Sequence, residues 1–236
     1  MNLNSIEKSA HGHGLSLRGQ FNTCPSDAIP DRPDGKESHS LLLFGQVGHS
    51  VWPAFIESSE YQDKQPNPLD RWSERIGNAL ARNLDGLLLL PFGDAPHHPF
   101  LRWAQRAEPV QPSKLGMLIH PTHGLWHAYR FAIALPIRLA ALPAHSPSTS
   151  LCDSCKEQPC LSACPVNAFD GHQYNVQACS QYLQINAGAA CHTDGCIARN
   201  ACPKGTLSRY VPEQQQFHLQ QFLVSRDQPL DEDNNS

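Results

Sequence analysis

The chain has 236 residues, a formal net charge of −4 and a sequence pI of about 6.3. This length suits one large or two modest domains with an apolar core. No basic stripe or aromatic-interleaved Lys/Arg run occurs, so charge gives nucleic acid binding no support, although it leaves tRNA open as a partner. No apolar stretch of about 18 residues indicates a membrane span.

Residues 1–39 are expected to form a tail, one short strand and a loop. Residues 1–13 have the composition of a loose tail, and the alternation over 15–21 predicts a short strand. Cys24 stands alone in a polar, proline-rich segment and is expected to be a free thiol without a role. Residues 25–39 are rich in turn formers and predict a surface loop.

Residues 40–143 predict an α+β domain built around a central sheet. Short apolar runs at 41–48 and 87–90 are typical of buried strands. Between them, apolar residues recur every four positions from Trp72 to Leu84, which is the pattern of an amphipathic helix. The other expected elements are a helix at 52–56, a polar loop at 61–68, a short helix carrying Phe100 and Trp103, and apolar segments at 115–119 and 125–135 joined as a hairpin by the turn 120–124.

The C-terminal part of the chain is dominated by a cysteine-rich module expected over 144–210. A proline-containing connection, 136–150, leads into it. A helix with an apolar side is expected over 211–226. The final segment, 227–236, is acidic and Asn-rich and is expected to be disordered.

Eight of the nine cysteines lie in this module, in two runs of four that each end in Cys-Pro. The number of cysteines and the Cys-Pro ending of each run indicate two [4Fe–4S] clusters. Iron binds soft thiolates, and cysteines two to four residues apart can curl around one cubane. A proline after the fourth cysteine turns the chain away from the cluster. The first run is Cys152, Cys155, Cys160 and Cys164; the second is Cys179, Cys191, Cys196 and Cys202.

In ferredoxin-type arrangements the fourth cysteine of each run holds the cluster of the other run. The spacing departs from the bacterial ferredoxin run, most of all in the long gap before Cys191, and leaves open whether Cys191 is a ligand. The crossed pattern predicts Cys152, Cys155, Cys160 and Cys202 for the first cluster, and Cys164, Cys179, Cys191 and Cys196 for the second.

Zinc binding, disulfide bonding and simple core packing are the alternatives to iron–sulfur clusters for these cysteines. Structural zinc uses paired Cys-x-x-Cys knuckles, but only one such pair occurs, and Cys-Pro endings are not typical of zinc sites. A disulfide framework needs an oxidising compartment and usually a smaller chain. Uninvolved core cysteines would not cluster so densely. The pattern therefore favours iron–sulfur clusters, with zinc second and disulfides third.

The expected compartment follows from the same cysteines. Thiols that stay reduced and metallated fit the cytosol. The first residues lack the charged start and apolar core of a secretory signal. We therefore expect a cytoplasmic protein that does not span a membrane.

The cysteine module resembles the C-terminal part of epoxyqueuosine reductases, which are cobalamin-dependent enzymes with two [4Fe–4S] clusters. The matching words begin with Cys152-Asp-Ser-Cys155 and include a tyrosine–leucine pair after Cys179. The others are Cys160-Leu-Ser-Ala-Cys164-Pro165-Val-Asn-Ala-Phe, Ala178-Cys179-Ser-Gln-Tyr-Leu, Gly195-Cys196 and Cys202-Pro203.

The preceding half is similar to the cobalamin-processing protein of vitamin B12 trafficking. The similarity lies in an Ile-His-Pro, then Gly, Trp, Ala and Arg, then an apolar strand ending in Leu-Pro, over residues 119–136. Both families share a nitroreductase-like α+β domain that holds a corrinoid. The resemblance implies a nitroreductase-like α/β sandwich followed by a ferredoxin-like two-cluster module, with cobalamin as a possible second cofactor. It assigns no catalytic residue, and whether the chain is an enzyme stays open.

Four side chains in this segment are candidates for a site on the corrinoid or substrate side. His120, His123 and His127 are polar groups that could lie near a ligand, and Arg130 could pair with a phosphate or carboxylate. The alternative is a well-packed aromatic strand after a hairpin turn, with no ligand at all.

Three functions are compatible with these patterns. The first is a redox protein that relays electrons from a donor protein, through two [4Fe–4S] clusters, to a small-molecule or corrinoid acceptor in its N-terminal domain. The second is a cobalamin-dependent reductase related to epoxyqueuosine reductase. The third is a non-catalytic electron-transfer subunit of a larger complex.

Overall fold

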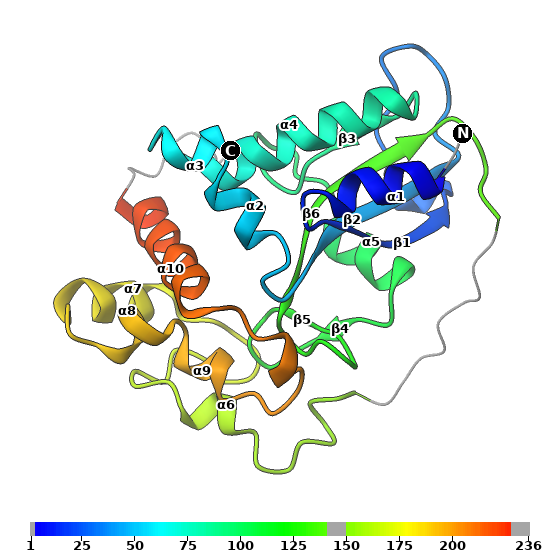
Figure 1. Cartoon of the computed structure of the whole chain (residues 1–236). Helices are drawn as coiled ribbons and strands as arrows, with labels where there is room; N and C mark the ends of the chain where they lie inside the picture. The colour runs from blue at the N-terminus through cyan, green and yellow to red at the C-terminus, as the bar shows by residue number, and fades with distance from the viewer. Residues whose placement is uncertain (1–2, 141–149, 228–236) are drawn as a thin grey trace.

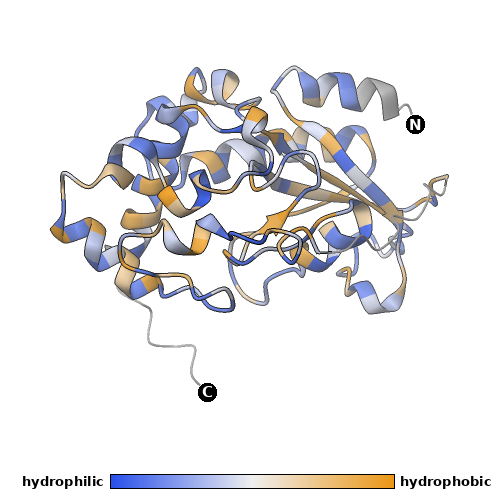
Figure 2. Cartoon of the chain, turned by 90° about the horizontal axis from the view of Figure 1, so that it is seen from below, coloured by the Kyte–Doolittle hydropathy of each residue, from blue (hydrophilic) through white to orange (hydrophobic). Residues whose placement is uncertain are grey.

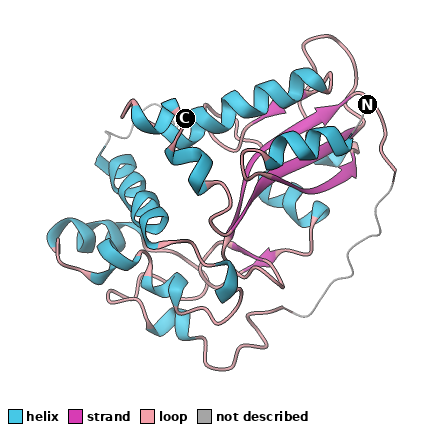
Figure 3. Ribbon diagram, in the orientation of Figure 1, coloured by secondary structure: helices cyan, strands magenta, loops and turns pink. Residues whose placement is uncertain are grey.

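The computed structural model describes residues 3–140 and 150–227. The strands of the main sheet lie in one part of the molecule, and the part that bears most of the cysteines consists of helices and loops (Figure 3). The middle of the predicted connection, at 141–149, and most of the predicted disordered tail, at 228–236, fall outside the described residues.

The centre of the strand-bearing part is a four-stranded antiparallel sheet in the order β1-β2-β6-β3. Strand β2 is buried on both faces, which explains its run of three leucines and a phenylalanine. The strands lie at nearly the places that the sequence predicts, and the mixed α/β fold is confirmed. They are β1 (Ser16–Asn22), β2 (Ser40–Val47), β6 (His127–Leu135) and β3 (Leu87–Leu89).

Helices cover both faces of this sheet (Figure 1). The long helix α4 (Pro68–Asn83) buries Trp72, Ile76 and Leu80 against one face, as the four-residue spacing predicts. The shorter α5 (Phe100–Ala107) buries Trp103 against the other face. Figure 2 shows the result: apolar residues follow the strands in the centre, and polar residues colour much of the surrounding helices.

The N-terminal residues correct the prediction of a loose tail over 1–13, because the chain forms helix α1 (Leu3–His11). Ala10 is fully buried in the core that α4 shares, and its carbonyl accepts the Leu15 N–H at 3.1 Å. The helix contacts β1 and α4. Leu3, Ile6 and Ala10 follow the i, i+3, i+7 pattern of an amphipathic helix, a signal that the polar composition concealed.

The predicted hairpin over 115–135 is also wrong. Its first strand, β5 (Leu118–Ile119), pairs with β4 (Gln111–Pro112) in a separate small sheet, and β6 pairs with β2 and β3. The turn 120–124 does form. It is closed by two hydrogen bonds of 2.9 Å between the backbones of His120 and Gly124.

Most of the remaining helices lie in the cysteine-bearing part, and all of them except α10 are shorter than α4 (Figure 1). They are α2 (Trp52–Ile56), α3 (Ser59–Gln62), α6 (Pro159–Ser162), α7 (Val176–Ile185), α8 (Ala190–Asp194), α9 (Ile197–Asn200) and α10 (Pro212–Asp227), with 3-10 turns at Pro25–Asp27 and Thr206–Ser208. None of the helices between residues 3 and 227, as far as these are described, is long and apolar enough to cross a membrane.

Several contacts join the cysteine-bearing part to the sheet-bearing part, and two of them hold its position. Phe217 of α10 packs among Trp52 and Phe55, in the core on the α4 face. The turn at Gly124 lies so close to Gly205 that a Cβ on either residue would fall 2.1 Å from backbone atoms of the other segment. Both glycines have positive φ, so no other residue fits there without moving the chain. The loop after Cys202 is therefore held against the turn that leads into β6.

Candidate functional site: two cysteine-lined cavities

The cysteines predicted for the first cluster surround one cavity of about 340 Å³. Cys152 and Cys155 lie in the loop before α6, and Cys160 lies in the first turn of α6. Cys202 follows α9 and closes the cavity from the other end of the module. Lys114 and Lys204 also line it.

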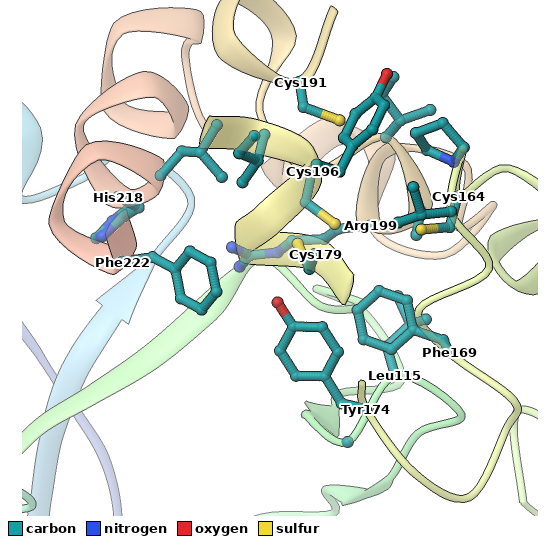
Figure 4. Close-up of a pocket in the computed structure, with 18 of the residues that line it drawn as sticks. Leu115, Cys164, Phe169, Tyr174, Cys179, Cys191, Cys196, Arg199, His218 and Phe222 are labelled. Carbon is teal, nitrogen blue, oxygen red and sulfur yellow. The ribbon is translucent and has the colours of Figure 1, made fainter. Parts of the chain in front are cut away.

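The cysteines predicted for the second cluster line a separate cavity of about 400 Å³ (Figure 4). Cys164 follows α6, and Cys179 lies on α7. Cys191 lies on α8, and Cys196 begins α9. The structure therefore brings together each of the two crossed sets that the sequence predicts. It places Cys191, the least regular member, with the other three.

Five of the cavity thiols have a raised pKa. Burial, reinforced by neighbouring cysteines, raises the pKa in each case. Hydrogen bonds partly oppose this: Cys196 accepts one from the backbone N–H of Arg199, and Cys179 accepts one from the Tyr174 hydroxyl. A metal centre in each cavity would supply the positive charge that these thiolates need. The five are Cys160, Cys179, Cys191, Cys196 and Cys202.

The spacing of the thiols distinguishes a cluster from a single ion. Among residues 3–140 and 150–227, no three His, Cys, Asp or Glu side chains lie close enough to bind one metal ion. All nine cysteines are free thiols. A zinc ion would gather four ligands around one point. A [4Fe–4S] cubane needs thiolates spread around a cage, one for each iron, and a cavity between them. Each cavity is lined by four thiols, which is the number of ligands that one cubane takes.

The three candidate histidines meet at the turn between β5 and β6. The rings of His120 and His123 stack with centroids 4.6 Å apart, and the His127 ring lies 5.9 Å from that of His120. The His127 Nε2 lies 3.1 Å from the Leu118 carbonyl, and its Nδ1 is buried without a partner among the described residues. The histidines therefore form one cluster, at the boundary with the cysteine-bearing part.

Arg130 does not join this cluster. It lines a third cavity, of about 350 Å³, between the start of α4 and α10. Its nearest charge is Asp70, 3.7 Å away, and its Nε is buried without a hydrogen-bond partner in the described chain. Burial lowers the pKa of the guanidinium and raises that of the Asp70 carboxyl. Arg130 therefore lines a different cavity from the histidines, and its role toward a phosphate or carboxylate stays a prediction.

Sequence reasoning missed a buried polar network beside His127. The Arg18 guanidinium donates to both Glu108 oxygens, at 2.9 and 3.0 Å, and to the Gln46 carbonyl at 2.8 Å. The Tyr129 hydroxyl donates to the same carboxylate, and burial next to Glu108 raises the pKa of that hydroxyl. Arg18 and Glu108 are far apart in the chain, so no local sequence pattern predicts that they form an ion pair.

The burial of His127 predicts an acid-sensitive fold. Burial and the nearby cations Arg18 and Arg199 lower the pKa of His127 to about 3, whereas an unfolded histidine titrates near 6.5. Below pH 6.5 His127 is protonated in the unfolded chain but stays neutral in the folded chain. The free energy of unfolding therefore decreases as the pH is lowered from 7 to 5. The variant His127→Gln keeps a donor for the Leu118 carbonyl but does not titrate in this range. We expect its free energy of unfolding to decrease by about 2 kcal/mol less than that of the parent between pH 7 and pH 5.

Urea unfolding of the parent and the His127→Gln variant across this pH range measures the effect. His172→Gln is a control, because that residue is exposed. Parallel curves for the parent and the His127 variant would show that the histidine does not titrate as inferred.

Comparison with known proteins adds a family relationship over part of the chain. No family model matches. An epoxyqueuosine reductase from Synechococcus sp. (strain RCC307) is 41% identical over 67 residues, which are 28% of this chain and 19% of that protein. The match thus spans about a fifth of the length of this curated relative.

Solved structures share the fold over most of the chain. An epoxyqueuosine reductase bound to a tRNA-Tyr stem loop aligns with a TM-score of 0.51 and 18% identity, covering 90% of this chain and 68% of that one. The Caenorhabditis elegans B12-trafficking protein CblC aligns with a TM-score of 0.54 and 12% identity, covering 95% of each chain. Epoxyqueuosine reductase from Bacillus subtilis aligns with a TM-score of 0.52 and 17% identity, covering 90% of this chain and 68% of that one. At these identities the likeness shows the fold alone.

Proposed function

We propose that this chain is an iron–sulfur redox protein that holds two [4Fe–4S] clusters and relays electrons toward a site in its sheet-bearing part. The observation that carries the proposal is the partition of the cysteines. Eight thiols from two runs divide between two cavities, four to each, and one cysteine of each run lies with the other run. This crossing is the arrangement of ferredoxin-type dicluster modules.

Each cluster, when bound, would store and release one electron. The chain's own part is to hold the two cavities in fixed positions. The interleaved cysteines tie the two runs into one unit, and the contact between Gly124 and Gly205 fixes that unit against the start of β6. A rigid mount of this kind keeps the donor and acceptor distances constant.

A corrinoid-dependent reductase is the second candidate. It is supported by the 67-residue identity to an epoxyqueuosine reductase and by the fold shared with that enzyme and with a B12-trafficking protein. On this proposal the acceptor is a corrinoid or another small molecule, and a separate protein donates the electrons. His120, His123 and His127 would face it at the boundary. The Arg130 guanidinium, whose Nε has no hydrogen-bond partner among the described residues, suits a phosphate or carboxylate group of the acceptor.

Metal and sulfide analysis of protein purified without oxygen tests the main proposal. We expect about eight irons and eight sulfides per chain, and EPR signals of reduced clusters after dithionite treatment. Cys24→Ala is the matched control, because this exposed thiol lies outside both cavities and should leave the iron content unchanged. Iron near zero, or about one zinc per chain, would overturn the proposal.

The corrinoid candidate has its own measurement. Adding cob(II)alamin to the anaerobic protein should change its visible spectrum, and Arg130→Met should weaken the change if the acceptor's anionic group lies in the third cavity. An unchanged spectrum at high protein concentration would rule out the corrinoid and leave the iron–sulfur proposal standing.

A further inference from the structure

The second cysteine cavity is lined by one cation, the half-buried Arg199. This residue lies on α9 and lines the cavity beside Cys179 and Cys196 (Figure 4). Its Nη2 donates to the Leu125 carbonyl at 2.5 Å. Its guanidinium carbon lies 4.3 Å from the centroid of the Trp126 ring and 4.6 Å from that of Tyr210. The charge therefore sits between the cavity and the first residues of β6.

The surroundings of this cation are otherwise apolar. Among the described residues that line the cavity, Arg199 is the one Lys, Arg, Asp or Glu, and most of the others are aliphatic or aromatic. The His218 ring also lines it, but burial and the two nearby arginines lower its pKa to about 3 and keep it neutral. The Nε of Arg199 is buried and finds no hydrogen-bond partner in the described parts of the chain. The cavity therefore contains one fixed cation in a mostly apolar lining.

The first cavity is lined by charges of a different kind. Its cations are Lys114, which is half-buried, and Lys204, which is exposed. Arg199 is half-buried like Lys114, but its guanidinium is held in place by the Leu125 carbonyl and by the rings of Trp126 and Tyr210. Water and salt screen the exposed Lys204 charge more strongly. Arg199 therefore brings a positive charge in a fixed position to the second cavity.

We propose that Arg199 raises the reduction potential of the second iron–sulfur centre. This inference rests on the proposed function, because it requires a cluster in the cavity. Reduction adds one electron, and hence one negative charge, to a thiolate-bound centre, and an apolar environment opposes that charge. Arg199 offsets this by stabilising the reduced state electrostatically, and its backbone N–H to Cys196 acts in the same direction. No bond or proton changes in the step.

A purely structural role for Arg199 makes different predictions. As a clamp, the side chain would matter for its hydrogen bond to Leu125 and its stacking on Trp126, whatever its charge. Arg199→Lys keeps the charge and loses the stacking. Arg199→Gln loses the charge and keeps a donor. The two variants therefore separate charge from clamping.

Redox titration under argon, with dithionite as the reductant and EPR as the readout, tests the proposal. We expect Arg199→Gln to lower the reduced-to-oxidised ratio of the second centre at least tenfold at a fixed potential, which is 59 mV for one electron. Arg199→Lys should change this ratio less than threefold. Arg199→Met is a second uncharged variant, to be used if the glutamine variant assembles poorly. Cys155→Ala, which should lack the first cluster, gives a background in which the second is seen alone.

Arg209→Gln is the matched control. Its guanidinium carbon also lies over Trp126, at 5.8 Å, but the residue is exposed and donates to the Asn200 carbonyl outside the cavity. It should leave the potential unchanged. Equal shifts in the lysine and glutamine variants, or no shift in uncharged variants that keep all their iron, would overturn the inference. A parent protein without iron would instead overturn the proposed function.

Discussion

The double variant Cys164→Ala/Cys179→Ala should retain about four irons per chain, whereas Cys164→Ala/Cys152→Ala should retain close to none. The first pair removes two thiols from the same cavity and leaves the other cavity intact. The second pair removes one thiol from each cavity, so both clusters lose a ligand. Iron and sulfide analysis after anaerobic reconstitution gives the result directly.

The reciprocal pair checks the other crossing. Cys202→Ala/Cys152→Ala should keep about four irons, and Cys202→Ala/Cys179→Ala should keep close to none. If each run held its own cluster, all four outcomes would be reversed. This reversal would contradict the crossed ligand sets but would still be consistent with iron–sulfur binding. Cys24→Ala should keep about eight irons and controls for the general effect of losing a thiol.

Local patterns explain why the sheet and the main helix could be predicted. The four-residue spacing on α4 and the apolar run of β2 can each be recognised within a short segment. The apolar positions of these patterns are the positions that the structure buries. The cysteine sets could be predicted for a different reason. The Cys-Pro ending of each run marks the residue that crosses, and the structure places Cys164 and Cys202 accordingly. Their role as ligands stays a prediction.

The errors concern partners that lie far apart in the chain. Nothing near β5 reveals that it pairs with β4, because two residues carry too little alternation to select a neighbour. Arg130 and His127 are three positions apart on β6, and the alternation of side chains along a strand places them on opposite faces of the sheet. A charged pair such as Arg18 and Glu108 becomes visible only when the fold joins α5 to the sheet.

That pair carries the second large effect: Glu108→Ala should lower the free energy of unfolding by about 3–5 kcal/mol. The substitution leaves the Arg18 guanidinium, whose side chain is 3% exposed, without its counter-charge. It also leaves the Tyr129 hydroxyl without its acceptor. Urea unfolding at neutral pH measures the loss.

An exposed pair of the same geometry is the control. Arg71 donates to both oxygens of Asp63, at 2.8 and 2.7 Å, but both side chains are more than a third exposed. Asp63→Ala should therefore cost less than about 1 kcal/mol, because water already solvates both charges. A similar cost for the two substitutions would contradict the role given to burial.

The double variant Arg18→Met/Glu108→Leu separates two contributions to the free energy of unfolding. One is the net stabilisation by the intact ion pair, and the other is the penalty for leaving one buried charge without its partner. Removing both charges leaves no uncompensated ion, so the double variant should be more stable than Glu108→Ala, although it loses the same ion pair. If the double variant is as stable as the parent, the network adds nothing to the free energy of unfolding, and its role is to position neighbouring residues. It would then hold Tyr129 and the start of β6 in register beside the histidine cluster, which is where electrons from the cysteine-bearing part would arrive. If it is as unstable as the single variant, the cost comes from lost packing, and the electrostatic account of this network fails.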